Sequence, residues 1–186
     1  MSGREWPLPE VAERHTAYRG RLFELRVDRL RWPDGTEAVR EIVIHPGAVC
    51  IVPVTARGTL LLVEQYRHPA GARLLELPAG TLEPGEDPET AARRELEEEI
   101  GMRAAVLEPL GGFYVAPGYT TEYIHLFAAS GLEPCSRERD ADEDIEVLEL
   151  TPEEALAAVR SGRITDGKSI IGLLFWRERS GERRLR

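Results

Sequence analysis

Hydrophobic and polar residues alternate in two short stretches near the start of the chain. Apolar residues occupy every second position across residues 23–27, and a β-branched run occupies residues 39–44 after the turn sequence Pro-Asp-Gly at 33–35. Alternation with a period of two is typical of half-buried strands, and Pro-Asp-Gly is typical of a turn. Residues 19–45 therefore predict a β-hairpin. Residues 1–16 are polar and contain two prolines, so we expect a flexible lead-in there.

Two strongly apolar runs come next, at residues 47–55 and 59–66, and an Ala-Arg-Gly turn separates them. Runs that stay apolar throughout are typical of strands buried on both faces of a sheet. The remaining pattern predicts strands at residues 74–77, 106–114, 123–129 and 145–150, and helices at residues 151–160 and 169–178, the second ending near Gly181. This mixture predicts an α/β domain in which helices cover a central sheet.

Residues 80–102 contain a loop followed by a short helix. Asp87 suits the N-cap, Pro88 the first helical position, and Gly101 the residue that ends the helix. At 3.6 residues per turn this helix has an apolar face formed by Ala92, Leu96 and Ile100. Beside it, an arc of about 100° carries Glu95, Glu98 and Glu99. We expect the apolar face to pack against the sheet and the acids to face a cleft.

The clustered acids are unfavourable on an ordinary surface helix. Glu95 and Glu99 are like charges one turn apart, and a contact of this kind costs roughly a few tenths of a kcal/mol. A divalent cation would convert the cluster into an oxygen-rich site, since Mg²⁺ and Mn²⁺ suit carboxylates together with substrate phosphates. The alternative is a solvated charged face that is stabilised by i,i+4 pairs of Glu and Arg on the same helix.

The spacing of these residues distinguishes the two alternatives. The fixed positions are Gly80, five residues, Glu86, seven residues, Arg94-Glu95-Leu96, one residue, Glu98-Glu99, one residue, and Gly101-Met102. This pattern resembles the Nudix box at every fixed position. The resemblance implies a Nudix hydrolase, which cleaves nucleoside diphosphates linked to another moiety and holds divalent cations with its box glutamates. It also implies an α/β/α sandwich with a mixed central sheet, preceded here by the antiparallel β-hairpin.

The resemblance assigns roles to residues inside and outside the box. Two or more Mg²⁺ or Mn²⁺ ions would be held by Glu95, Glu98, Glu99 and the Ala79 carbonyl, with Glu98 and Glu99 catalytic. Glu143 aligns with an acid of this branch that contacts metal or acts as a base, although Asp140, Asp142 and Asp144 are close alternatives. We expect Arg94 to orient a box glutamate or to serve the structure alone, and Gly80 and Glu86 to support the loop.

Two further stretches carry the substrate signal. Residues 64–69 (EQYRHP) and 113–122 (FYVAPGYTTE) look like ADP-ribose pyrophosphatase sequences. Arg67 suits a bidentate phosphate contact, although surface arginines at strand ends are common, and Glu122 suits a ribose hydroxyl. The resemblance implies hydrolysis of ADP-ribose to AMP and ribose 5-phosphate. A broader pyrophosphatase acting on GDP-mannose or NADH, and a non-catalytic ligand-sensing domain, are the alternatives.

Composition narrows the picture further. With 186 residues, of which 42% are hydrophobic, the chain can bury a full core. A net charge of −9 disfavours a nucleic-acid partner, and two cysteines do not form a disulfide framework. No apolar run reaches about 18 residues, so we expect a cytoplasmic protein that does not enter membranes.

The domain organisation follows from these elements. We expect a lead-in at 1–16, a β-element at 17–46 and the Nudix domain at 47–186. The hairpin has one apolar face and no partner in the chain before it. Residues 19–35 also resemble the N-terminal element of the ADP-ribose pyrophosphatase branch, which implies a homodimer.

Overall fold

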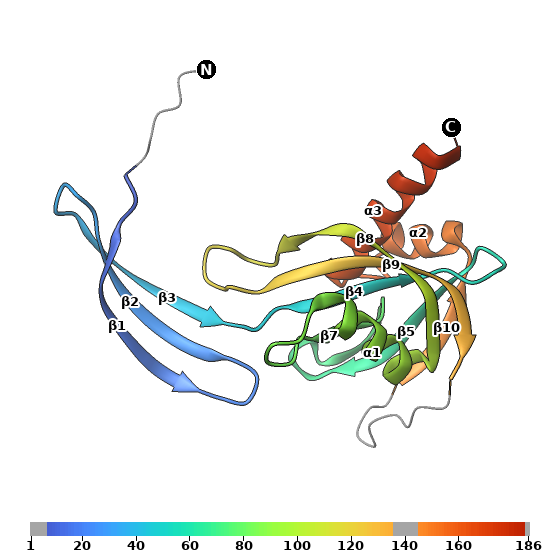
Figure 1. The fold of residues 1–186 in the computed structure, drawn as a ribbon, viewed down its shortest axis with the longest axis horizontal. Helices are drawn as coiled ribbons and strands as arrows, with labels where there is room; N and C mark the ends of the chain where they lie inside the picture. Colours follow the sequence, from blue (N-terminus) through green and yellow to red (C-terminus); the bar gives the residue numbers. More distant parts are fainter. Residues whose placement is uncertain (1–6, 136–144, 185–186) are drawn as a thin grey trace. The chain divides into compact units, whose positions relative to one another are not determined.

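The computed structural model describes residues 7–135 and 145–184, and Figure 1 shows its strands and helices. The elements in chain order are β1 (Glu10–Arg19), β2 (Glu24–Arg31), β3 (Glu37–Ile44), β4 (Ala48–Pro53), β5 (Leu60–Arg67), η1 (His68–Ala70), β6 (Ala72–Glu76), β7 (Ala79–Thr81), α1 (Pro88–Ile100), β8 (Met102–Tyr114), β9 (Tyr123–Pro134), β10 (Ile145–Leu150), α2 (Pro152–Ser161) and α3 (Gly167–Arg184). The chain divides into two compact units. The first comprises Met1–Gly47 and Tyr114–Tyr123, and the second comprises Ala48–Phe113 and Ile124–Arg186.

The second unit contains a four-stranded and a three-stranded sheet, with strand orders β7-β4-β9-β8 and β10-β5-β6. The four-stranded sheet is mixed, because β4 pairs in parallel with β9 and antiparallel with β7. Strand β5 pairs antiparallel with both β10 and β6. The predicted mixed central sheet is therefore confirmed.

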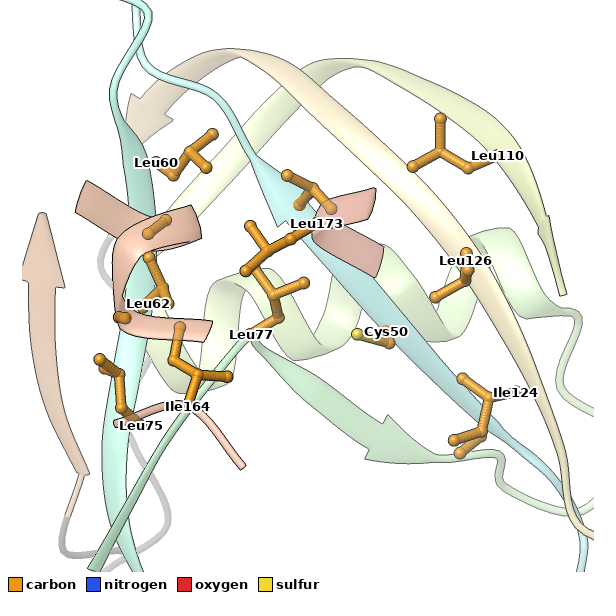
Figure 2. Close-up of a cluster of buried hydrophobic side chains, with 14 residues drawn as sticks. Cys50, Leu60, Leu62, Leu75, Leu77, Leu110, Ile124, Leu126, Ile164 and Leu173 are labelled. Atoms are coloured by element: carbon orange, nitrogen blue, oxygen red, sulfur yellow. The ribbon is translucent and has the colours of Figure 1, made fainter. Parts of the chain in front are cut away.

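Two hydrophobic clusters pack on opposite faces of β4, whose six residues are all buried. Val49 and Ile51 belong to the cluster that includes Ala92 and Leu96 of α1. The alternate residues Cys50 and Val52 belong to the other cluster, which includes side chains of α2 and α3; Figure 2 shows Cys50 in it. Successive side chains of a strand point to opposite faces. Helices therefore cover both faces, and the predicted α/β/α layering is confirmed.

The helix termini match their sequence signals. Asp87 Oδ1 accepts hydrogen bonds from the backbone nitrogens of Glu89 and Thr90, both at 3.1 Å, at the start of α1. Gly101 ends α1 with a φ of 65°, in the left-handed region that favours glycine. At α2, Thr151 and Glu154 form the expected capping box. Local side-chain chemistry thus fixes where α1 begins and ends, and with it the position of the box acids.

The first unit contains the antiparallel sheet β1-β2-β3. The predicted hairpin is confirmed as β2 and β3, with Gly35 at a φ of 84° in the turn between them. The segment Tyr114–Tyr123 joins this unit through hydrogen bonds from Val43 N to the Tyr119 carbonyl at 2.8 Å and from Thr121 N to the Val43 carbonyl at 3.0 Å. No hydrophobic side chain in the described part of this unit is buried.

The expected lead-in at residues 1–16 differs from the structure, because Glu10–Arg19 forms strand β1 and pairs with β2. Nine of its ten residues are exposed, so the strand carries no apolar alternation that would reveal it. The guanidinium of Arg14, a residue of β1, forms a bidentate pair with the carboxylate of Asp28, at 2.9 Å for each hydrogen bond. Charge pairing with a buried carboxylate thus holds a strand that hydrophobic periodicity does not predict.

Helix α3 also differs from its predicted range. It begins at Gly167 and continues to Arg184, passing through Gly181, where we expected it to end. Glycine inside a helix costs only about 1 kcal/mol relative to alanine, so it does not stop a helix that other contacts hold. At the N-terminal end, Asp166 Oδ2 accepts a hydrogen bond from Ser169 N at 2.9 Å and caps the first turn of the helix.

Candidate active site

Helix α1 places its acids at different depths. Glu95 and Glu99 are buried, with exposed fractions of 8% and 4%, although both are carboxylates. The Glu98 side chain is more accessible, at 22%. Buried carboxylates need compensating donors or cations, because desolvation penalises their charge. The two deepest acids of the predicted set therefore indicate a site built to hold charge below the surface.

Backbone atoms of strand β7 lie against Glu95 and Glu99. Ala79 N donates a hydrogen bond to Glu99 Oε2 at 3.0 Å. A Cβ atom at Gly80 would lie only 1.8 Å from Glu95 Oε1 and 2.4 Å from Oε2, so the Glu95 carboxylate occupies the space that any larger residue would need. Gly80 thus serves by the absence of a side chain. The Ala79 residue, predicted as a ligand through its carbonyl, lies directly beside Glu99.

Arg94 lies at the centre of the box acids. Its Nη1 donates to Glu95 Oε1 at 2.6 Å and to Glu98 Oε2 at 2.8 Å. Its Nε and Nη2 each bond a different oxygen of Glu86 at 3.0 Å, and Nη2 also donates to the Thr81 carbonyl at 3.1 Å. One guanidinium therefore fixes three carboxylates and the end of β7 at once.

The ion pairs shift the acid–base behaviour of this centre. Hydrogen bonds from Arg94 lower the pKa of the Glu86 carboxyl below its ordinary value. In return, the hydrogen bonds to Glu86, the charge of Glu95 and the hydrogen bond to Glu98 raise the pKa of Arg94 above its ordinary value. Glu86 also accepts from Glu83 N at 3.0 Å, which ties the loop before α1 to the same centre.

The donor set suits a hard divalent cation. Its members are carboxylate oxygens and a backbone carbonyl, which Mg²⁺ and Mn²⁺ prefer, and the Glu95 carboxylate lies over a glycine that leaves room for it. In the arrangement shown, Arg94 Nη1 lies where the carboxylates of Glu95 and Glu98 converge. Among the described residues no three His, Cys, Asp or Glu side chains form a ready-made metal cluster.

Arg67, predicted to bind phosphate, lies at the end of β5 and contacts an acid that we did not single out. Its Nε and Nη2 donate to Glu76 Oε1 and Oε2 at 2.8 and 2.7 Å. Glu76 is 1% exposed, whereas the Arg67 side chain is 38% exposed. The hydrogen bonds to Glu76 raise the pKa of Arg67 above its ordinary value. The charge of Glu99 also raises this pKa, by less than Glu76 does. Arg67 is therefore anchored from below and lies within electrostatic range of the box acids.

The described contacts do not test the roles predicted for two residues, Glu122 and Glu143. Glu122 belongs to the first unit, where its backbone nitrogen bonds Thr120 Oγ1 at 3.1 Å and its carbonyl accepts from Val115 N. Glu143 and its neighbouring loop acids lie outside the described residues. The roles of both remain predictions.

The sequence matches a family model and several known proteins. The family model of the NUDIX domain matches residues 44–170. The chain is 42% identical to the methanol dehydrogenase activator of Bacillus methanolicus and 41% identical to the ADP-ribose pyrophosphatase of Bacillus subtilis strain 168. Both alignments span 160 residues, which is 85% of this chain and 86% of each relative.

A solved structure matches over nearly the whole length. The crystal structure of an ADP compounds hydrolase has a TM-score of 0.87 and 26% sequence identity, covering 97% of this chain and 98% of its own. Within the described residues, no helix combines the length and the apolar character needed to span a bilayer.

Proposed function

The chain belongs to the Nudix family, and from this premise we propose that it hydrolyses the pyrophosphate bond of ADP-ribose, giving AMP and ribose 5-phosphate. The observation that carries the proposal is the seating of the Glu95 carboxylate over Gly80 beside the buried Glu99. The complete box argues against a non-catalytic ligand sensor, which would not need these buried acids. The substrate is supported by the 41% identity to an ADP-ribose pyrophosphatase.

Glu95, Glu98, Glu99 and the Ala79 carbonyl would hold the Mg²⁺ or Mn²⁺ ions, two or more in number. Bound ions of this kind neutralise a diphosphate and lower the pKa of a coordinated water. Arg94 holds Glu95 and Glu98 in place before substrate arrives, at 2.6 and 2.8 Å. Preorganised charge is the main contribution that a protein makes to phosphoryl transfer, so this positioning is functional.

The remaining roles concern the substrate and the attacking water. Arg67 would bind a phosphate through the side of its guanidinium that Glu76 does not use, because Nη1 is not among the donors to that carboxylate. Glu122 would bond a ribose hydroxyl, and Glu143 would accept the proton of the water as general base. We propose the last two roles from the family resemblance.

A substrate panel tests the proposed reaction. Purified protein with Mg²⁺ is expected to give a higher kcat/KM for ADP-ribose than for GDP-mannose, NADH or diadenosine polyphosphates, and EDTA should abolish turnover. A higher kcat/KM for GDP-mannose would instead establish the broader sugar-nucleotide specificity. Tight binding of ADP-ribose without turnover of any substrate would establish a sensor.

We also propose that the chain is a homodimer that uses its first unit. Three or more strands need a hydrophobic face to be stable, yet this sheet buries no hydrophobic side chain within the described residues. Val11 and Val39, with exposed fractions of 47% and 51%, are available to a second copy. Light scattering should give twice the 20.8 kDa mass of one chain, and a mass of one chain at micromolar concentration would contradict the proposal.

The free thiols Cys50 and Cys135 suit the reducing cytoplasm, which is our proposed location.

A further inference from the structure

The only lysine of the 186-residue sequence occupies an unusual place. Lys168 lies in the first turn of α3, and its side chain is 14% exposed. Its Nζ contacts Glu76 Oε2 at 2.5 Å and Asp166 Oδ2 at 3.0 Å. A long cationic side chain is rarely buried without a specific partner, because desolvation penalises its charge. The contact with Glu76 joins two residues that are 92 positions apart in the sequence.

Glu76 is the shared partner of two cations. Arg67 occupies both of its carboxylate oxygens, and Lys168 adds a third contact at Oε2. A bidentate pair fixes the plane of the guanidinium as well as its position. The orientation of Arg67 therefore depends on a carboxylate that Lys168 also holds, at Oε2.

Four charged side chains make up this group. Arg67 and Lys168 are cations and Glu76 and Asp166 are anions, and Asp166 contacts Lys168 and also caps α3 through Ser169. The group is neutral as a whole, so Lys168 acts on Arg67 through the position of Glu76 and not by adding net positive charge. Burial alone would raise the pKa of Glu76, but the hydrogen bonds from Arg67 and the charge of Lys168 lower it below its ordinary value.

We infer that Lys168 is a positioning residue for substrate binding, which acts by holding Glu76 and thereby sets how Arg67 meets the diphosphate. The inference rests on the proposed function, in which Arg67 binds that group. Lys168 touches no substrate in this account. Its effect passes through two contacts on the described side chains, Lys168 to Glu76 and Glu76 to Arg67.

A purely structural role for Lys168 makes a different prediction, and Thr151 provides the control. Its Oγ1 accepts a hydrogen bond from Glu154 N at 3.2 Å and caps α2. Thr151 contacts neither Lys168 nor its partners in any hydrogen bond described for it. Thr151→Ala should lower Tm, because an N-cap is lost, and leave KM for ADP-ribose unchanged.

The decisive experiment is a double-mutant cycle on the full chain. Lys168→Met keeps the length of the side chain and removes its charge, so KM for ADP-ribose should rise about tenfold while kcat stays within about twofold. Arg67→Met should lower kcat/KM by roughly a hundredfold, and the double variant should equal Arg67→Met alone. Lys168→Arg should restore most of the wild-type KM.

Three results would overturn the inference. The first is a double variant whose loss is the product of the two single losses, since Lys168 would then act independently of Arg67. The second is a KM increase in Thr151→Ala equal to that in Lys168→Met. The third is an unchanged kcat/KM in Arg67→Met.

Failure of the proposed function is separable from these results. If wild-type protein prefers another nucleoside diphosphate sugar, the assigned substrate is wrong, and the same cycle on the preferred substrate still tests Lys168. If it hydrolyses nothing, the cycle is measured on the Kd of ADP-ribose by calorimetry, where the same non-additivity is expected.

Discussion

Two ion-pair centres in the second unit have opposite compositions. At the first, one cation, Arg94, contacts three carboxylates. At the second, one carboxylate, Glu76, contacts two cations. At the first centre the carboxylates outnumber the cation, whereas the second centre is neutral once Asp166, which contacts Lys168, is counted. Unbalanced negative charge at the Arg94 centre suits metal ions, and the balanced Glu76 centre suits a positioning role for Arg67.

The largest expected effect comes from removing Glu99, the buried box acid on the same helix as the Arg94 centre. Glu99→Gln should lower kcat by about a thousandfold or more, because a neutral amide cannot hold a divalent cation against a diphosphate. Steady-state kinetics at saturating Mg²⁺ measures it, and circular dichroism checks the fold. Glu89→Gln is the matched control on the same helix, since that side chain is 56% exposed and pairs only with Arg93 among the contacts described for it. Near-wild-type turnover in Glu99→Gln would end the assignment of metal binding to this centre.

A smaller loss is expected from filling the space beneath Glu95. Gly80→Ala adds a methyl group 1.8 Å from Glu95 Oε1, so the carboxylate must move. When a catalytic group is misplaced by about 1 Å, the rate falls by about a hundredfold. The apparent Mn²⁺ affinity, from titration of activity, should fall with it. Gly181→Ala is the control, because nothing lies within 4 Å of its added methyl group. It should keep full activity, and an equal loss in both variants would exclude a specific role for Gly80.

At the Glu76 centre the expected loss concerns binding. Glu76→Gln leaves Arg67 and Lys168 without their shared counter-charge, so the guanidinium loses its fixed plane. We expect KM for ADP-ribose to rise about tenfold with little change in kcat, because ground-state and transition-state binding are affected alike. A fall in kcat with constant KM would show that the two centres do not divide their roles in this way.

The smallest effect is a pH dependence of stability. The folded pKa of Glu76 lies below its ordinary value of 4.5, so the stability it contributes is present above that pH and is lost as the pH falls toward the folded pKa. The difference in unfolding free energy between wild type and Glu76→Gln should therefore be constant from pH 7 to about pH 5 and shrink below pH 4.5. Urea unfolding at each pH measures it. A difference that persists unchanged to pH 3 would mean that Glu76 is not an ionised partner in the fold.

The Arg94 centre was largely predictable from sequence, because its parts are close along the chain. The box spacing and the Asp87 and Gly101 signals fixed α1, and helical periodicity then grouped the three acids. Only the extent of Arg94's contacts was missed, since we expected it to orient one glutamate. A side chain with five donors can bond several acids, but sequence does not show which of them it reaches.

The Glu76 centre was not predictable in the same way. Glu76 lies in a short apolar run, and its contact with Lys168 spans 92 residues, so no periodic pattern links them. A single lysine carries no sequence pattern that would indicate its partner. Strand β1 was missed for a related reason, since its pairing rests on charges such as Arg14 with Asp28 and not on an apolar face.

The scarcity of lysine also makes the chain its own chemical probe. Reagents that acylate amines can modify only one side chain, and that amine is enclosed by Glu76 and Asp166. Its ion pairs should slow the adduct until the first turn of α3 opens. Peptide mapping by mass spectrometry separates the Lys168 adduct from that of the α-amino group, and its rate would report on the opening of this turn without any engineered label.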